Sequence, residues 1–173
     1  MDLTPREFAS PRTQLLLAHT GTTTHLLQHL LRASLQARVL TCIRAPAGSH
    51  PPAAALLELA ADEQMALRRS LLLLPCGTPA SANLVLGAVD RHPWTAPLLE
   101  NPQQPLGILL ANTRHPRIPL GCGLSTWNID ESGRPAAAKC YRILDQDRGT
   151  PALCIYEQFN PGLIDPTLSG EAL

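Results

Sequence analysis

The sequence predicts an α+β fold in which a single antiparallel β-sheet has helices packed on one face. Helical leucine spacing comes first along the chain, and strand-length apolar runs separated by Gly- and Pro-containing turns follow in hairpin order. Neither a long βαβ pattern nor a glycine-rich phosphate loop is present, which argues against a dinucleotide-binding fold. The 173 residues, 45% of them hydrophobic, suit one domain with its own core. We therefore expect one domain over residues 1–173, with a core at about 13–160 and a tail at 161–173.

The first part of the chain is expected to be mainly helical. Two short helices lie within residues 11–33, and Gly21 separates them. The second helix has a buried stripe, because its leucines recur at helical spacing: Leu26, Leu27, Leu30 and Leu31. A strand at 35–44 and an Ala- and Leu-rich helix at 53–61 follow.

The remainder reads as strands and turns. The runs at 65–74 and 81–89 form a hairpin around a turn at Gly77-Thr78-Pro79. Residues 90–104 form a loop with about one turn of helix near Leu98. The last expected elements are a short helix at 108–112 and strands at 123–129, 138–144 and 152–159.

Composition excludes several classes of partner. Lys plus Arg equals Asp plus Glu, 14 each, and aromatic residues make up 3%, so we expect neither a nucleic acid nor a membrane surface as partner. The beginning of the chain has no leader-peptide pattern, and no apolar run reaches membrane-spanning length. The five Cys are widely spaced without a C-x-x-C motif, which favours a reducing, cytoplasmic compartment. We expect no metal or cofactor, since the pair His25 and His29 is better explained as solvent-facing.

Charged residues inside apolar strands are the strongest candidates for a site. Arg68 and Arg69 interrupt an apolar run, and adjacent strand residues point to opposite faces, so one of them points inward. A buried guanidinium needs an anionic partner, which is a carboxylate either of the protein or of a ligand. Glu157 lies on an alternating apolar face, where a carboxylate is costly unless it is paired or functional.

Four segments, in this order, resemble the chorismate pyruvate-lyase family. They are LLLAHTGTTT at 15–24, Leu67-Arg68-Arg69 before the turn Gly77-Thr78-Pro79, PLGILL at 105–110, and Gly149-Thr150-Pro151 leading to EQF at 157–159. The resemblance implies that family's fold. It also implies a lyase that eliminates pyruvate from chorismate to leave 4-hydroxybenzoate without a cofactor. The implied partner is an aromatic carboxylate, bound by a monomer or a weak dimer.

The resemblance also assigns roles to residues. The carboxylate-binding arginine falls on Arg69, with Arg68 as the neighbouring choice if the strand register slips, and the active-site acid falls on Glu157. Backbone contacts fall on Leu106 and Gly107, and a variable pocket position falls on Thr23. Some members carry a second arginine after the turn. Its absence here leaves a second carboxylate to backbone N–H groups or to one of three side chains: Asn83, Arg114 or Arg117.

Two other functions remain open at this stage. The same fold serves as a non-catalytic ligand-sensing domain in transcription regulators, where it normally follows a DNA-binding helical domain. We expect no such DNA-binding domain here, since only residues 1–12 precede the predicted core. Alternatively, the chain is a relative adapted to another aromatic or polyketide-derived ligand, as the missing second arginine suggests.

Overall fold

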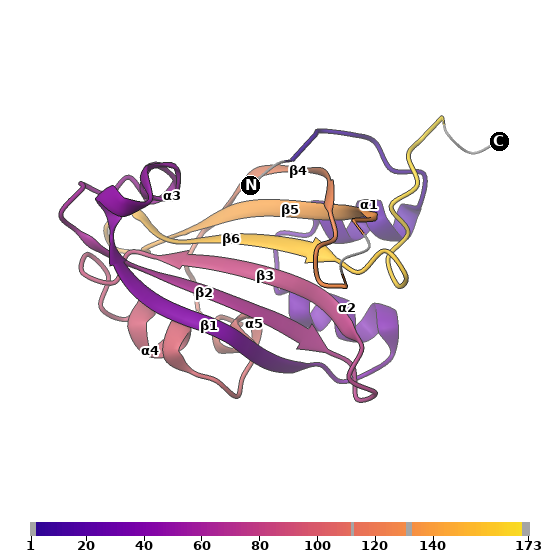
Figure 1. The fold of residues 1–173 in the computed structure, drawn as a ribbon, viewed down its shortest axis with the longest axis horizontal. Coiled ribbons are helices and arrows are strands. Elements are labelled where there is room, and N and C mark those ends of the chain that lie inside the picture. The colour runs from indigo at the N-terminus through magenta and orange to yellow at the C-terminus, as the bar shows by residue number, and fades with distance from the viewer. Residues whose placement is uncertain (1–2, 112, 131–132, 171–173) are drawn as a thin grey trace.

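The computed structural model, which describes residues 3–111, 113–130 and 133–170, contains a six-stranded antiparallel sheet (Figure 1). The strand order across the sheet is β1-β2-β3-β6-β5-β4, and every neighbouring pair is antiparallel. The strands are β1 (Gln36–Pro46), β2 (Gln64–Leu73), β3 (Pro79–Gly87), β4 (Arg117–Thr126), β5 (Pro135–Leu144) and β6 (Pro151–Phe159). The expected fold class is confirmed.

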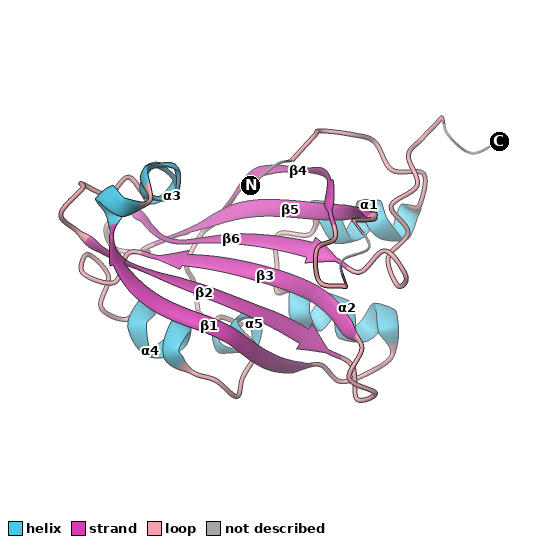
Figure 2. Cartoon of the chain, in the orientation of Figure 1, coloured by secondary structure: helices cyan, strands magenta, loops and turns pink. Residues whose placement is uncertain are grey.

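Most helices cover one face of this sheet (Figure 2). The helices are α1 (Pro11–Ala18), α2 (Thr23–Leu31), α3 (Pro51–Leu57), α4 (Thr95–Glu100) and α5 (Leu106–Leu109), with a 3-10 turn at Ala47–Ser49. Leucines of α1 and α2 pack around Phe159, and leucines of α4 and α5 pack on Val85 and Ile155. The short α3 packs on the opposite face, against Cys154 and Tyr156. None of the helices in the described ranges has the length and hydrophobicity needed to cross a membrane.

The boundaries differ from expectation mainly around β4. This strand starts at Arg117, whereas the sequence suggested a strand only from residue 123. Prolines are tolerated there because β4 is an edge strand, and its pairing with β5 is irregular between Pro119 and Gly121. The short helix expected at 108–112 is α5, which starts earlier, and its expected last residue, Asn112, lies outside the described residues.

Close packing of α5 on the beginning of α2 explains a glycine in the motif Pro105-Leu106-Gly107. A Cβ atom at Gly107 would collide with the Oγ1 atom of Thr24 and would lie 3.3 Å from Cγ2 of Thr22. A larger residue at this position would therefore push α5 away from α2.

The segment that follows β6 contributes to the core. Ile164 is 1% exposed and belongs to the same apolar cluster as Phe8 and Phe159. Leu168 pairs with Phe8 in an isolated β-bridge, and the amide of Ser169 donates to the carbonyl of Glu7. Residues 161–170, expected as a tail, thus hold the N-terminal segment against the core.

Truncation of Ile164 tests this packing. Ile164→Ala should lower the free energy of unfolding by about 2–5 kcal/mol, because it leaves a cavity in a closed apolar cluster. Leu15→Ala is the matched control, since Leu15 is 55% exposed and its truncation should change stability by less than about 0.5 kcal/mol. Urea denaturation measures both, and equal effects of the two substitutions would contradict the docking of this segment.

Candidate functional site

Two rows of side chains cross the helix-covered face of the sheet. Residues directly opposite each other in antiparallel strands point to the same face, so the pairing register defines the rows. The first row is Arg68, Val85, Ile155 and Tyr141, and the second is Ser70, Asn83, Glu157 and Lys139. Polar and charged groups are therefore concentrated on β2, β3, β5 and β6 at the level where α2 and α5 cover the sheet.

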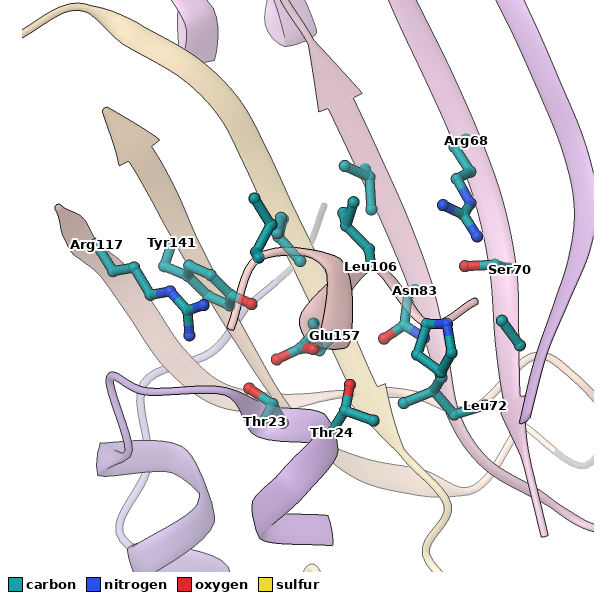
Figure 3. Close-up of a pocket in the computed structure, with 16 residues that line it drawn as sticks. Thr23, Thr24, Arg68, Ser70, Leu72, Asn83, Leu106, Arg117, Tyr141 and Glu157 are labelled. Carbon is teal, nitrogen blue, oxygen red and sulfur yellow. The ribbon is translucent and has the colours of Figure 1, made fainter. Parts of the chain in front are cut away.

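A pocket lies between these rows and the two helices (Figure 3). Its polar lining comprises Thr23, Thr24, Arg68, Ser70, Asn83, Arg117, Tyr141 and Glu157, and its apolar lining comprises Ala37, Leu72, Val85, Pro105, Leu106, Leu110 and Ile155. Arg68 and Ser70 stand on one side, Arg117 and Tyr141 on the other, and Glu157 between them. The hollow of about 30 Å³ has room for one or two water molecules and is too small for a ring-sized guest.

Arg68 is a buried cation without an acidic partner. Its side chain is among the largest fully buried ones, at 1% exposure. Nη1 donates to the carbonyl oxygen of Leu98 in α4 at 3.0 Å, while Nε has no hydrogen-bond partner. Within the described ranges no carboxylate lies within 4.0 Å of the guanidinium. Burial lowers the pKa of Arg68, which expresses the cost of keeping this charge away from water.

Glu157 and Lys139 face each other across the second row. Lys139 Nζ lies 3.9 Å from Glu157 Oε2, and both side chains are buried. Burial raises the pKa of Glu157, and the positive charge of Lys139 partly opposes that rise. Burial likewise lowers the pKa of Lys139, and Glu157 partly opposes it. Lys139 is also held by the end of α1, because Nζ donates to the carbonyls of Leu16 and His19 at 3.0 Å each.

The third side of the pocket is formed by Arg117, Tyr141 and the beginning of α2. Arg117 Nη1 donates to the carbonyls of Thr20 and Gly21 in the turn between α1 and α2. Burial raises the pKa of Tyr141 well above its ordinary value, so its hydroxyl stays protonated. The buried Oγ1 of Thr23 has no hydrogen-bond partner among the described residues.

Arg69, the arginine to which the resemblance assigned carboxylate binding, lies outside this pocket. It pairs with Leu84, which pairs with Tyr156, so it points to the opposite face and is exposed. The residues of β2 alternate between the two faces without interruption, and Arg68, Ser70 and Leu72 all line the pocket. Arg69 lies between Arg68 and Ser70, so its side chain points away from the pocket.

The other sequence-based candidates divide as follows. Thr23, Asn83, Leu106, Gly107 and Glu157 all line the pocket, as does Arg117, whereas Arg114 does not line it. The histidines of the i, i+4 pair, at positions 25 and 29, are exposed on α2. In the described part of the chain no three His, Cys, Asp or Glu side chains are grouped to hold a metal ion.

Lys139 and Tyr141, which lie beside or line the pocket, were not among the candidates from the sequence. Lys139 interrupts a run of buried alanines in β5, which was a signal of the same kind as Arg68. Tyr141 follows two positions later on the same face, and it was indistinguishable from an ordinary core aromatic.

Comparison with known proteins supports the fold. No protein-family model and no curated protein sequence matches the chain. Among solved structures, the effector domain of PhnF from Mycobacterium smegmatis matches with a TM-score of 0.63 and 14% identity, over 83% of this chain and 91% of that one. A ligand-binding domain from Bordetella bronchiseptica, described as part of a GntR-family transcriptional regulator, matches with a TM-score of 0.58 and 18% identity, over 79% and 90%. A GntR-family transcriptional regulator from Enterococcus faecalis matches with a TM-score of 0.54 and 10% identity, over 77% and 99%.

These likenesses correct the expected activity. The expectation of a chorismate lyase is wrong, because the solved structures that match this chain over most of its length include several described as transcriptional regulators or as effector or ligand-binding domains. Chorismate, pyruvate and 4-hydroxybenzoate have no support from them. At identities of 10–18% the comparisons establish the fold, which is that of the effector domains of GntR-family regulators.

Proposed function

We propose that this chain is a non-catalytic ligand-binding domain that takes a small anionic molecule into the pocket between the sheet and α5. The observation that carries the proposal is Arg68, a guanidinium that is 1% exposed and has, among the residues that the structure describes, neither a hydrogen-bond partner for Nε nor a carboxylate within 4.0 Å. A buried cation is costly unless it is paired, and an anionic ligand supplies the missing partner. The effector and ligand-binding domains with the same fold support this reading.

The charge balance of the pocket favours an anion as well. Arg68 and Arg117 line it, Lys139 stands behind it, and Glu157 is the acidic group that faces them. With all four ionised, the surroundings of the pocket carry two net positive charges. Protonation of Glu157, which its raised pKa favours, adds a third. An anion is therefore attracted, while a cation is repelled.

The sheet keeps Arg68 from being neutralised by Glu157. The two residues are separated by two strand spacings and by two residues along the strand, because β3 lies between β2 and β6. With about 4.8 Å between strands and 3.4 Å per residue, their backbones lie roughly 12 Å apart. Strand side chains stand nearly perpendicular to the sheet, so this gap persists above it. It offers a ligand an anion-binding group at one end and a hydrogen-bonding acid at the other.

Entry of such a ligand involves α4 and α5. The guanidinium of Arg68 holds α4 through the carbonyl of Leu98, and Leu106 of α5 and Leu110, directly after this helix, close the hollow. An anion that binds the guanidinium competes with the Leu98 carbonyl, and displacement of the two leucines creates the required volume. Ligand binding is thereby connected to the position of the segment that contains α4 and α5.

Removal of the guanidinium tests the anion site directly. Arg68→Ala should weaken the binding of the tightest anion in a panel of small carboxylates and phosphate monoesters by about 10- to 150-fold, since a hydrogen bond to a charged group contributes about 1.5–3 kcal/mol. Isothermal titration calorimetry measures the dissociation constants. Arg69→Ala is the matched control, because it removes the same group from the opposite, exposed face and should leave binding unchanged. Equal behaviour of the two variants, or no anion binding by the native protein, would exclude the proposal.

The same guanidinium should cost stability in the absence of ligand. Arg68→Met replaces an incompletely bonded buried cation by an apolar chain of similar length, and we expect it to raise the free energy of unfolding by about 1–3 kcal/mol. Denaturant unfolding without ligand measures this change. Arg69→Met should be nearly neutral, and a destabilised Arg68→Met variant would show that the arginine is structural.

Glu157 should make stability depend on pH in a defined direction. Its folded pKa lies above the ordinary value of 4.5, so the folded state binds the proton more tightly than the unfolded state does. Its contribution to stability is complete below the ordinary pKa and is lost as the pH rises through the raised one. The free energy of unfolding of Glu157→Gln, relative to the native protein, should therefore increase from pH 4 to pH 8 in urea titrations. Loss of the opposing charge lowers the pKa of Lys139 further and acts in the same direction, so a flat or falling difference would refute the raised pKa.

A further inference from the structure

A second cavity lies on the other side of the Lys139–Glu157 pair. It is lined by the end of α1, the turn between α1 and α2, and strands β4 and β5, it opens to the surface, and we call it the α1–β4 cavity. Its volume is about 190 Å³, compared with about 30 Å³ for the pocket beside Arg68. An engineered apolar cavity of about 150 Å³ in another protein binds benzene. The α1–β4 cavity therefore admits a ring-sized molecule without rearrangement of the chain.

The cations around this cavity are already bonded to the protein. Lys139 donates to two carbonyls at the end of α1, and Arg117 donates to the carbonyls of Thr20 and Gly21. An anion bound to Lys139 Nζ or Arg117 Nη1 would compete with these carbonyls, which hold the turn between the helices. The exposed lining is predominantly apolar, with Leu17, Pro119 and the ring of Tyr141 among its members. An uncharged apolar molecule thus gains more there than an anion does.

His19 adds one polar contact to this lining. Its pKa is lowered by burial and by the positive charges of Lys139 and Arg117, so the imidazole is neutral at pH 7. A neutral imidazole has one donor and one acceptor nitrogen, which matches a single hydroxyl or N–H group on the guest.

We propose that the α1–β4 cavity is a second small-molecule site, separate from the anion pocket, for a compact uncharged ring that carries at most one hydroxyl or N–H group. The site stands on its volume and its predominantly apolar lining. It does not depend on anion binding at Arg68.

Cys122 provides a direct test, because it lines the cavity and its residue is exposed. The native protein is treated with iodoacetamide with and without indole, and alkylation of each cysteine is followed by peptide mass spectrometry. Indole at about ten times its dissociation constant should slow alkylation of Cys122 about tenfold. Cys76, exposed at the turn between β2 and β3, is the internal control and should react at an unchanged rate.

Two variants at Cys122 complete the test. Cys122→Phe should fill the cavity and abolish the rise in melting temperature that indole produces, while Cys122→Ser, which keeps the volume, should retain it. Arg68→Ala should also retain it, which separates this site from the anion pocket. The proposal is overturned if indole leaves Cys122 unprotected, protects Cys76 equally, stabilises Cys122→Phe as much as the native protein, or loses its effect in Arg68→Ala.

Discussion

The unpaired guanidinium of Arg68 is the constraint on which the rest of the site depends. Four charged groups meet on one face of the sheet. Lys139 is matched by two carbonyls and by Glu157 at 3.9 Å, and Arg117 by the turn between α1 and α2, while Oε2 of Glu157 accepts no hydrogen bond from the described residues. Arg68 has one carbonyl, from Leu98, and no acid in the described part of the chain. The matched charges hold the helices on the sheet, whereas Arg68 carries a desolvation cost that a bound anion relieves.

The antiparallel register determines which side chains surround Arg68 and line the pocket with it. Ser70 and Asn83 lie in one row with Glu157, and Val85 and Ile155 lie in the row of Arg68, so the space between the arginine and the acid has both hydrogen-bonding and apolar walls. Above them, Gly107 lets α5 approach α2 closely enough to close the hollow. The same contact makes α5 the natural cover, because a four-residue helix is held by few side chains and by the chain on either side of it.

The sequence was sufficient for the fold class and for the inward orientation of Glu157. Strict alternation in β6 placed Glu157 inward correctly, since Leu153, Ile155 and Phe159 on the same face are all buried. Alternation could not choose between Arg68 and Arg69, because both faces of β2 are covered and both Leu71 and Leu72 are buried. The resemblance assigned carboxylate binding to Arg69 by its distance from the turn, with Arg68 as the neighbouring choice, and the structure places Arg68 in the pocket. Distance from a turn alone therefore does not decide which of two adjacent strand residues points inward, because a one-residue difference reverses the face.

Lys139 shows why the remaining step needed a structure. Lys139 follows buried alanines in β5, and like Arg68 it is a charged residue in an apolar strand that needs a partner. The sequence alone does not distinguish the two cases. Lys139 is bonded largely to backbone carbonyls, and one of them, the carbonyl of His19, lies 120 residues earlier in the chain. Every residue has a backbone carbonyl, so the sequence does not indicate which carbonyl will accept a hydrogen bond from a buried cation. Whether a buried cation is satisfied by the backbone or left for a ligand is therefore decided by where a helix happens to end. Here α1 ends beside Lys139, and the carbonyl of Leu98 reaches only one nitrogen of Arg68.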